Sequence, residues 1–209
     1  MNTEQRIDAI RVMLDMQNAM NQRVHDEWFA QDFEWYRAIW IECGEMLEHF
    51  GWKWWKHQKP DVEQVKLELV DIFHFGLSSR IDGQTDFHDI SRTMAEEMAS
   101  PVTGAEFRIT LEKLAATAVG EHRFDGAAFA GCLEQIGMSF EELYRSYVGK
   151  NTLNFFRQDH GYKDGTYIKI WHGREDNEHL VEIIAALDIA SPSFRDDVYQ
   201  ALESNYPSA

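Results

Sequence analysis

Two pairs of acidic residues constrain this chain more than any other feature of its sequence. Glu42 and Glu45 are three residues apart, and so are Glu68 and Asp71. In a helix this spacing puts both side chains of a pair on one face. Large apolar residues surround both pairs, and an acid on an apolar face is costly to bury unless its charge is compensated. We therefore predict two neighbouring helices whose acids converge on a divalent metal such as Mg²⁺. The alternative is two solvated stripes on amphipathic helices.

The composition favours an all-α fold. The chain has 209 residues, of which 44% are apolar, and this is long enough for a hydrophobic core. Only 4 prolines and few alternating β-branched runs favour helices over strands. We expect a helical bundle that forms a single domain over residues 1–209, with a less regular insert or cap at residues 84–137.

The net charge limits the partners. A formal charge of −16 at pH 7 is the opposite of the basic surface that general nucleic-acid binding needs, so we expect no nucleic-acid partner. The polar start and the lack of a long apolar run predict no signal peptide and no membrane partner. Cys43 and Cys132 fall inside predicted helices, which fits a reducing cytoplasm better than a disulfide framework.

Apolar periodicity, caps and breakers predict where the helices lie. We expect helices over residues 4–24, 33–50, 62–81, 127–136, 140–158 and 176–187, and a short one at 90–98 inside an irregular segment, 84–102. A capping box at Thr103 and Glu106 predicts a helix that runs to about residue 119, and a second box at Ser139 and Glu142 opens the longest late helix. Ser191-Pro192 predicts the start of the last helix.

Two amides interrupt the apolar stripe of the first predicted helix. Gln17 and Asn21 fall where the periodicity expects core residues. Buried amides are normally hydrogen-bonded, so this pair either ties the helix to a neighbour or binds a ligand. His74 lies three residues after Asp71, on the face of the acids, and a lone histidine there is more often a core residue than a ligand.

A cationic cluster follows near the C-terminal end of a later helix. Lys150, Asn154 and Arg157 form one line along that helix, and a turn-rich segment with Tyr162 comes next. Arginine offers bidentate geometry to phosphate oxygens, so this line indicates either a phosphate site or a solvated helix end with ordinary surface lysines. Residues 52–56 interleave tryptophan and lysine, a pattern that suits either a base-stacking site or aromatics at the edge of the core.

Together these motifs resemble the dimeric all-α deoxyuridine triphosphatases (dUTPases), which belong to the all-α nucleoside triphosphate pyrophosphohydrolase superfamily. The resemblance runs from Met13 to Asn177 and is weakest at residues 84–137. The acidic pairs mark only the superfamily, whereas the amide pair and the long C-terminal motif select the dUTPase branch. Asp159-His160 departs from the pattern, because it adds a negative charge beside the phosphate cluster. The matching stretches are residues 13–17 with Asn21, 42–45 with 52–56, 68–75, 147–158 and 161–177.

The resemblance implies a homodimeric enzyme that cleaves dUTP, and also dUDP, to dUMP and so keeps uracil out of DNA. It implies several Mg²⁺ ions per site, with Mn²⁺ as a substitute, and Glu45 as the acceptor of a proton from the attacking water. The implied metal ligands are Glu42, Glu45, Glu68 and Asp71. The implied uracil and sugar contacts are Gln17, Asn21, Trp52, Trp55, His74 and Phe75. The implied phosphate contacts are Lys150, Asn154, Arg157, Tyr162, Lys163, Lys169 and Asn177.

Two alternatives stay open at this point. A related pyrophosphohydrolase could act on another nucleotide, such as dCTP, and Gln17 and Asn21 would discriminate between the bases. A helical nucleotide-binding protein could have kept the fold and lost the chemistry, but all four carboxylates are present.

Overall fold

The computed structural model describes residues 1–188, 191 and 193–207. Its described elements are almost all helices, as the sequence predicts. In chain order they are α1 (Thr3–Val24), the 3₁₀ helix η1 (Trp28–Gln31), α2 (Trp35–Phe50), α3 (Val62–Arg80), α4 (Phe87–Met98), α5 (Phe107–Glu121), α6 (Gly126–Ile136), α7 (Phe140–Asp159), β1 (Ile170–Trp171), β2 (Arg174–Glu175), α8 (Asp176–Ala186) and α9 (Phe194–Asn205). The two short strands form an antiparallel hairpin.

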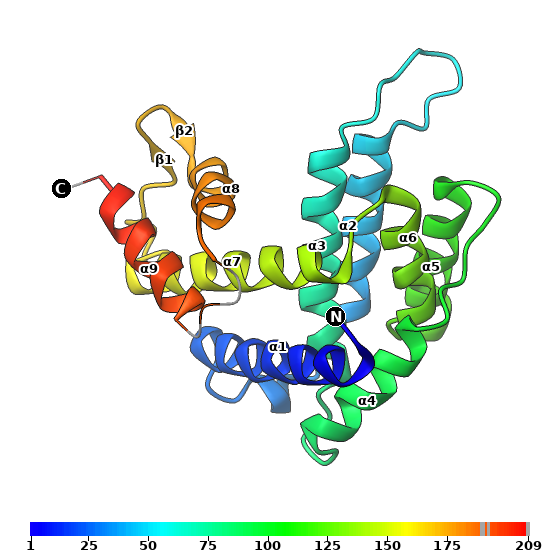
Figure 1. The fold of residues 1–209 in the computed structure, drawn as a ribbon, viewed down its shortest axis with the longest axis horizontal. Coiled ribbons are helices and arrows are strands. Elements are labelled where there is room, and N and C mark those ends of the chain that lie inside the picture. The colour runs from blue at the N-terminus through cyan, green and yellow to red at the C-terminus, as the bar shows by residue number, and fades with distance from the viewer. Residues whose placement is uncertain (189–190, 192, 208–209) are drawn as a thin grey trace.

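The helices form a base and two arms (Figure 1). Helices α1 and α7 lie side by side along the base, and they are in contact. The pair α2 and α3 rises from the base as one arm, with α5 and α6 packed beside it. Helices α8 and α9, together with the β hairpin, form the other arm. Among the described residues, no helix is both long enough and apolar enough to cross a membrane.

Local signals set the starts of three of the four helices that carry the site. Asn2 and Gln5 form a capping box at α1, and the Asp61 side chain accepts a hydrogen bond from the Gln64 backbone N–H at α3. The Ser139 hydroxyl accepts from the Glu142 backbone N–H (3.1 Å) at α7, where the sequence predicts a cap.

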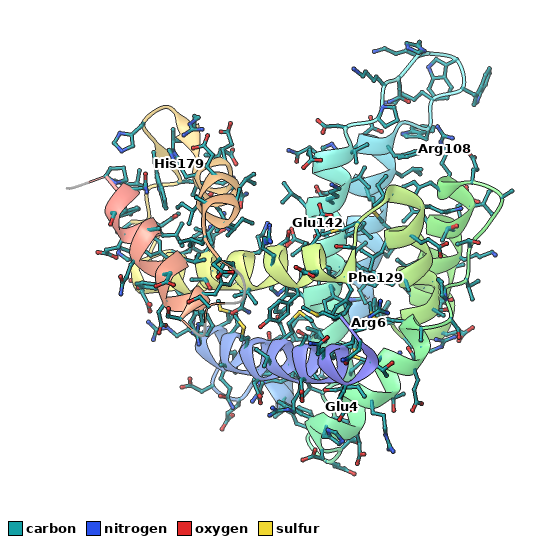
Figure 2. The ribbon with its side chains drawn as sticks, in the orientation of Figure 1. Glu4, Arg6, Arg108, Phe129, Glu142 and His179 are labelled. Carbon is teal, nitrogen blue, oxygen red and sulfur yellow. The ribbon has the colours of Figure 1, made fainter. Side chains whose placement is uncertain are left out.

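The core joins α3, α6 and α7. The Phe73 ring stacks on Phe129 at 5.1 Å between centroids and meets Tyr147 edge-on at 5.9 Å. Figure 2 shows Phe129 in the interior, where α6 approaches the α2–α3 arm. Such contacts between fully buried rings bury large apolar areas and stabilise the crossing of these helices.

The predicted insert at residues 84–137 is better ordered than the sequence suggests. Its helices α4, α5 and α6 carry Met94, Leu114 and Phe129, respectively, into the same hydrophobic cluster as the rest of the chain. The single domain stays a prediction from the sequence. Helix α4 begins at Phe87, earlier than predicted, because the Asp86 side chain caps it by accepting from the His88 backbone N–H (2.8 Å).

Two other predicted helix starts are wrong. Thr103 does not cap α5, which begins at Phe107 after Glu106 in an extended conformation. Instead the loop is pinned where the Gly104 N–H donates to the Thr110 hydroxyl (2.6 Å). The last helix begins at Phe194 rather than at Ser191-Pro192, and Pro192 lies outside the described residues.

Candidate active site

Helices α2 and α3 bring three of the four predicted acids together. Glu42, Glu68 and Asp71 each offer a carboxylate oxygen, and these oxygens lie within 4.8 Å of one another. Glu68 is buried, and the other two are half-buried. We call these three residues the acidic cluster. Three hard oxygen donors at this spacing fit a divalent cation such as Mg²⁺.

The electrostatics of the acidic cluster also favour a bound cation. Burial, followed by the charges of Asp71, Glu68 and Glu45, raises the pKa of Glu42 from 4.5 to about 8. Burial and the charge of Asp71 also raise the pKa of Glu68. Lys150 offsets part of this repulsion, because its Nζ lies 3.1 Å from Asp71 Oδ2. His49 Nε2 lies 3.4 Å from Glu68 Oε1. A bound divalent ion would offset the rest.

Glu45 lies beside the acidic cluster rather than in it. It is exposed on α2, one turn after Glu42. Its charge is close enough to raise the pKa of both Glu42 and Glu68. This position, outside the ligand set but near it, suits a group that exchanges protons with water at the site.

The two predicted amides belong to a buried network with Ser78, His74 and Tyr147. Gln17 Nε2 donates to Asn21 Oδ1 (3.0 Å) and to Ser78 Oγ (2.9 Å). Gln17 Oε1 accepts from the Tyr147 hydroxyl (2.8 Å) and from His74 Nδ1 (2.7 Å). An amide has two donors and two acceptor positions, so Gln17 is saturated and ties α1 to α3 and α7. One N–H of Asn21 Nδ2 donates to Ser78 Oγ (3.0 Å). The other has no partner among the described residues.

A cavity of about 310 Å³ lies between α1, α3 and α7 and joins most of the predicted contacts. We call it the α1–α3–α7 cavity. The predicted site residues that line it are Gln17, Asn21, Asp71, His74, Phe75, Asn154, Arg157 and Tyr162. Asp71 therefore belongs to both the acidic cluster and the cavity wall. Sequence reasoning missed the aromatic side of this cavity, which includes Phe33 and Trp35, and Trp35 stacks on Phe75 at 6.3 Å between centroids.

Arg157 is held in a fixed orientation by Asp176, which sequence reasoning did not single out. Arg157 Nε donates to Asp176 Oδ2 (2.8 Å) and Nη2 donates to Oδ1 (2.9 Å). Asp176 is fully buried and also accepts from the Tyr167 hydroxyl (2.8 Å). Arg157 Nη1 donates to Asn154 Oδ1 (3.2 Å), and Nη2 reaches Asn177 Oδ1 at 3.4 Å. One of the five guanidinium N–H groups, on Nη1, has no partner in the part of the chain that the structure describes.

Six predicted contacts do not line this cavity. Lys150 and Asn177 line a neighbouring hollow of about 530 Å³ instead. Trp52 and Trp55 are in the loop at the far end of the α2–α3 pair (Figure 1). This loop ends where α3 begins, at Val62, and His74 of the cavity lies twelve positions further along α3. At a rise of 1.5 Å per residue, these two positions are about 18 Å apart along the helix. Lys163 instead donates to the Val24 carbonyl at the C-terminal end of α1, where a cation complements the free carbonyls. Lys169 pairs with Glu175 at the surface, with 3.0 Å between Nζ and Oε2.

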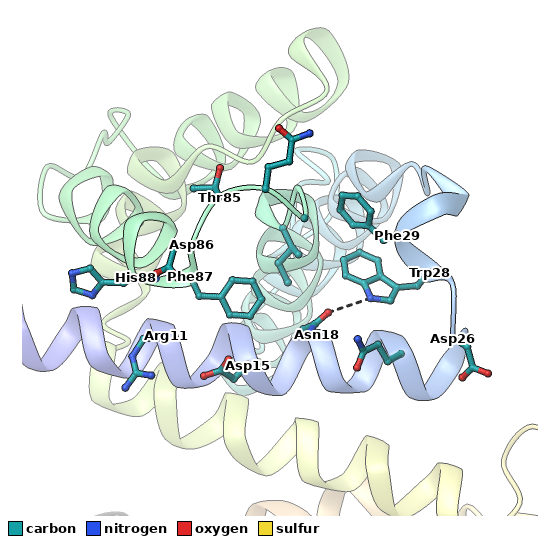
Figure 3. Close-up of a pocket in the computed structure, with 14 residues that line it drawn as sticks. Arg11, Asp15, Asn18, Asp26, Trp28, Phe29, Thr85, Asp86, Phe87 and His88 are labelled. Atoms are coloured by element: carbon teal, nitrogen blue, oxygen red, sulfur yellow. Dashed lines mark hydrogen bonds between the residues drawn. The ribbon is translucent and has the colours of Figure 1, made fainter.

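A larger hollow of about 830 Å³ lies on another face of α1 (Figure 3). It is lined by Arg11, Asp15 and the segment between α3 and α4, and Trp28 Nε1 donates to Asn18 Oδ1 (3.3 Å) at its edge. The only group of carboxylates close enough to share a metal ion, among the described residues, is the acidic cluster beside the smaller cavity. We therefore place the candidate active site at the α1–α3–α7 cavity.

The fold is all-α, and a cluster of three carboxylates that could hold a divalent ion lies beside a cavity of the size that binds small molecules. A family model for dUTPases matches residues 9–162 of the chain. The chain therefore belongs to the dUTPase family, in its all-α branch, and its activity is the hydrolysis of dUTP. No curated protein matches the chain. The matched segment contains the acidic cluster, the amide network and Arg157, but ends before Asp176.

Proposed function

We propose that the acidic cluster holds Mg²⁺ and that dUTP, and also dUDP, is cleaved there to dUMP. The observation that carries the proposal is the convergence of three carboxylates within 4.8 Å of one another, one of which, Asp71, also lines the cavity that contains the amide pair. A bound ion would supply a Lewis acid for phosphate oxygens and water. Mn²⁺ prefers similar oxygen ligands and is expected to substitute.

The residues around the acidic cluster would have different roles, according to their positions. Glu45, near the acidic cluster but outside it, would accept a proton from water. Lys150, which now pairs with Asp71 at 3.1 Å, would bind phosphate oxygens together with the cavity residues Asn154, Arg157 and Tyr162. Because Asp176 offsets the charge of Arg157, this arginine would contribute a directed N–H rather than a free positive charge.

The base would be read at the amide end of the cavity. The free N–H of Asn21 suits a carbonyl acceptor such as O4 of uracil, whereas cytosine offers an amino group at that position. A site built on hydrogen bonds rejects such a mismatch strongly, because a buried polar group stays unpaired. His74 and Phe75, which line the same cavity, would contact the base or the sugar. Burial, followed by the charge of Lys150, lowers the pKa of His74 to about 3, so its ring is neutral.

The direct test is a comparison of nucleotides under defined metal conditions. Pyrophosphate release should be fastest from dUTP, and much slower from dCTP and dTTP. Activity should disappear with a chelator and return with Mg²⁺ or Mn²⁺. Equal rates for dUTP and dCTP would contradict the base assignment, and full activity in the chelator would contradict the metal assignment.

We also propose that the protein is a homodimer in which the loop with Trp52 and Trp55 completes the partner's cavity. Trp54 in this loop is 89% exposed, and Trp55 is 57% exposed, which is costly for tryptophan in an isolated chain. A cytoplasmic location is a further proposal, which the two free, buried cysteines support.

Mixing two inactive variants tests the shared site. Trp52→Ala/Trp55→Ala chains and Glu68→Gln chains should each be inactive, and their mixture should recover up to about a quarter of the wild-type activity, because one of the two sites in a mixed dimer has both parts intact. Sedimentation should give the mass of two chains. A monomer in sedimentation, or a mixture without activity, would contradict this arrangement.

A further inference from the structure

Ser78 connects both amides of the candidate base site to the backbone. It lies on α3, four residues after His74, and is 1% exposed. Its Oγ donates to the His74 backbone carbonyl (3.0 Å) and accepts from Gln17 Nε2 (2.9 Å) and Asn21 Nδ2 (3.0 Å). The hydroxyl therefore uses its one hydrogen and both of its acceptor positions.

The other members of this network can reverse the direction of their hydrogen bonds. A side-chain amide exchanges oxygen and nitrogen by a half turn, and a neutral histidine moves its proton between ring nitrogens. The Tyr147 hydroxyl donates to Gln17 Oε1, but the Met13 backbone carbonyl lies at 3.1 Å as a second acceptor. Gln17, Asn21, His74 and Tyr147 alone would thus allow two networks of opposite polarity.

Ser78 removes this ambiguity because a carbonyl oxygen only accepts. With its hydrogen committed to the His74 carbonyl, Oγ can only accept from the two amides. Both amides must then turn their NH₂ groups toward Ser78, and Asn21 keeps its free N–H. In the opposite polarity, the Asn21 oxygen would face the lone pairs of Ser78, and Asn21 would lose the free donor that suits a carbonyl.

We propose that Ser78 is a positioning residue that sets the polarity of the amide pair and thereby makes the site prefer uracil to cytosine. The proposal rests on the proposed function of Asn21 as a reader of the base. Uracil O4 accepts a hydrogen bond and cytosine N4 donates one, so the two polarities of Asn21 favour different bases. Ser78 itself does not touch the nucleotide.

The test is the ratio of kcat/KM for dUTP to kcat/KM for dCTP. Ser78→Ala removes the hydroxyl and leaves a small side chain that fits the helix. We expect this ratio to fall by about tenfold, which corresponds to about 1.4 kcal/mol, as activity on dCTP rises and activity on dUTP falls. Ser79→Ala is the matched control: the Ser79 hydroxyl donates to the Gly76 carbonyl (2.7 Å), and no bond joins it to the amides. Its ratio should equal that of the wild type.

A second variant separates polarity from packing. Ser78→Thr keeps a hydroxyl that can donate to the carbonyl four residues earlier, so it should keep most of the wild-type ratio even if the added methyl lowers the melting temperature. An equal fall in activity on both nucleotides in Ser78→Ala, or an unchanged ratio, would overturn the proposal. If the wild type itself does not prefer dUTP to dCTP, the reading of the base by Asn21 fails first, and the role of Ser78 fails with it.

Discussion

Glu68→Gln should abolish the hydrolysis of dUTP without destabilising the metal-free protein. Glu68 is a buried member of the acidic cluster, and the amide keeps its shape but removes the charge that a cation needs. A metal ion stabilises developing charge by several kcal/mol. Each 1.36 kcal/mol is a factor of ten in rate, so kcat/KM should fall by about a thousandfold or more.

Glu68→Gln should be at least as stable as the wild type in the absence of metal, although it is inactive. The charge of Glu68 is one of the causes that raise the pKa of Glu42, so its removal relieves repulsion in the metal-free cluster. Unfolding in a chelator should therefore need as much denaturant as for the wild type, or more. Glu63→Gln, an exposed position on the same helix, should change neither activity nor stability appreciably.

Glu45→Gln distinguishes proton transfer from metal binding. Because Glu45 lies outside the acidic cluster, its amide variant should retain most of the affinity for Mg²⁺, measured by calorimetry, while it loses turnover. Glu68→Gln should lose both. Turnover that persists in Glu68→Gln, or a matched loss of metal affinity in the two variants, would contradict the division of roles.

The acidic cluster was predictable because its geometry is mostly local. A spacing of three residues fixes the relative direction of Glu68 and Asp71 on α3, and consecutive helices usually pack side by side. The sequence could not separate Glu42, which joins the cluster, from Glu45, which is exposed. That difference depends on the rotation of α2 against α3, which tertiary packing sets.

Ser78 was missed because it acts through partners that are distant in sequence. Ser78 bonds Gln17 and Asn21, which are 61 and 57 residues away. One local signal was available: Ser78 follows Asp71 by seven residues, so both lie on one face of α3. The alternation of tryptophan and lysine at residues 52–56 indicated a surface that could stack on a base. It could not indicate where this loop lies relative to the cavity, because that depends on the packing of the helices.

Asp176→Asn should destabilise the fold by about 3–5 kcal/mol, the usual cost of removing one partner from a buried ion pair. Asp176 is fully buried, and the Arg157 side chain is only 13% exposed, so the guanidinium would stay buried without its counter-charge. The measurement is denaturant unfolding of both proteins. Glu182→Gln is the control on the same helix, because it breaks an exposed pair with Arg174 and should change the stability little.

The effect of Asp176→Asn should also depend on pH with a definite sign. Burial raises the pKa of Asp176, but the hydrogen bonds and charge of Arg157 outweigh it, so the net shift is downward from 3.8. A carboxyl with a lowered folded-state pKa adds stability above its ordinary pKa, and this stability is lost as the pH falls through the lowered value. The difference in the free energy of unfolding between the wild type and Asp176→Asn should therefore be largest near pH 7 and become smaller below about pH 4. A difference in stability that grows in acid would contradict the ion pair.

A double variant, Arg157→Gln/Asp176→Asn, should recover much of the stability, because no buried charge is left unpaired, but it should not recover the activity.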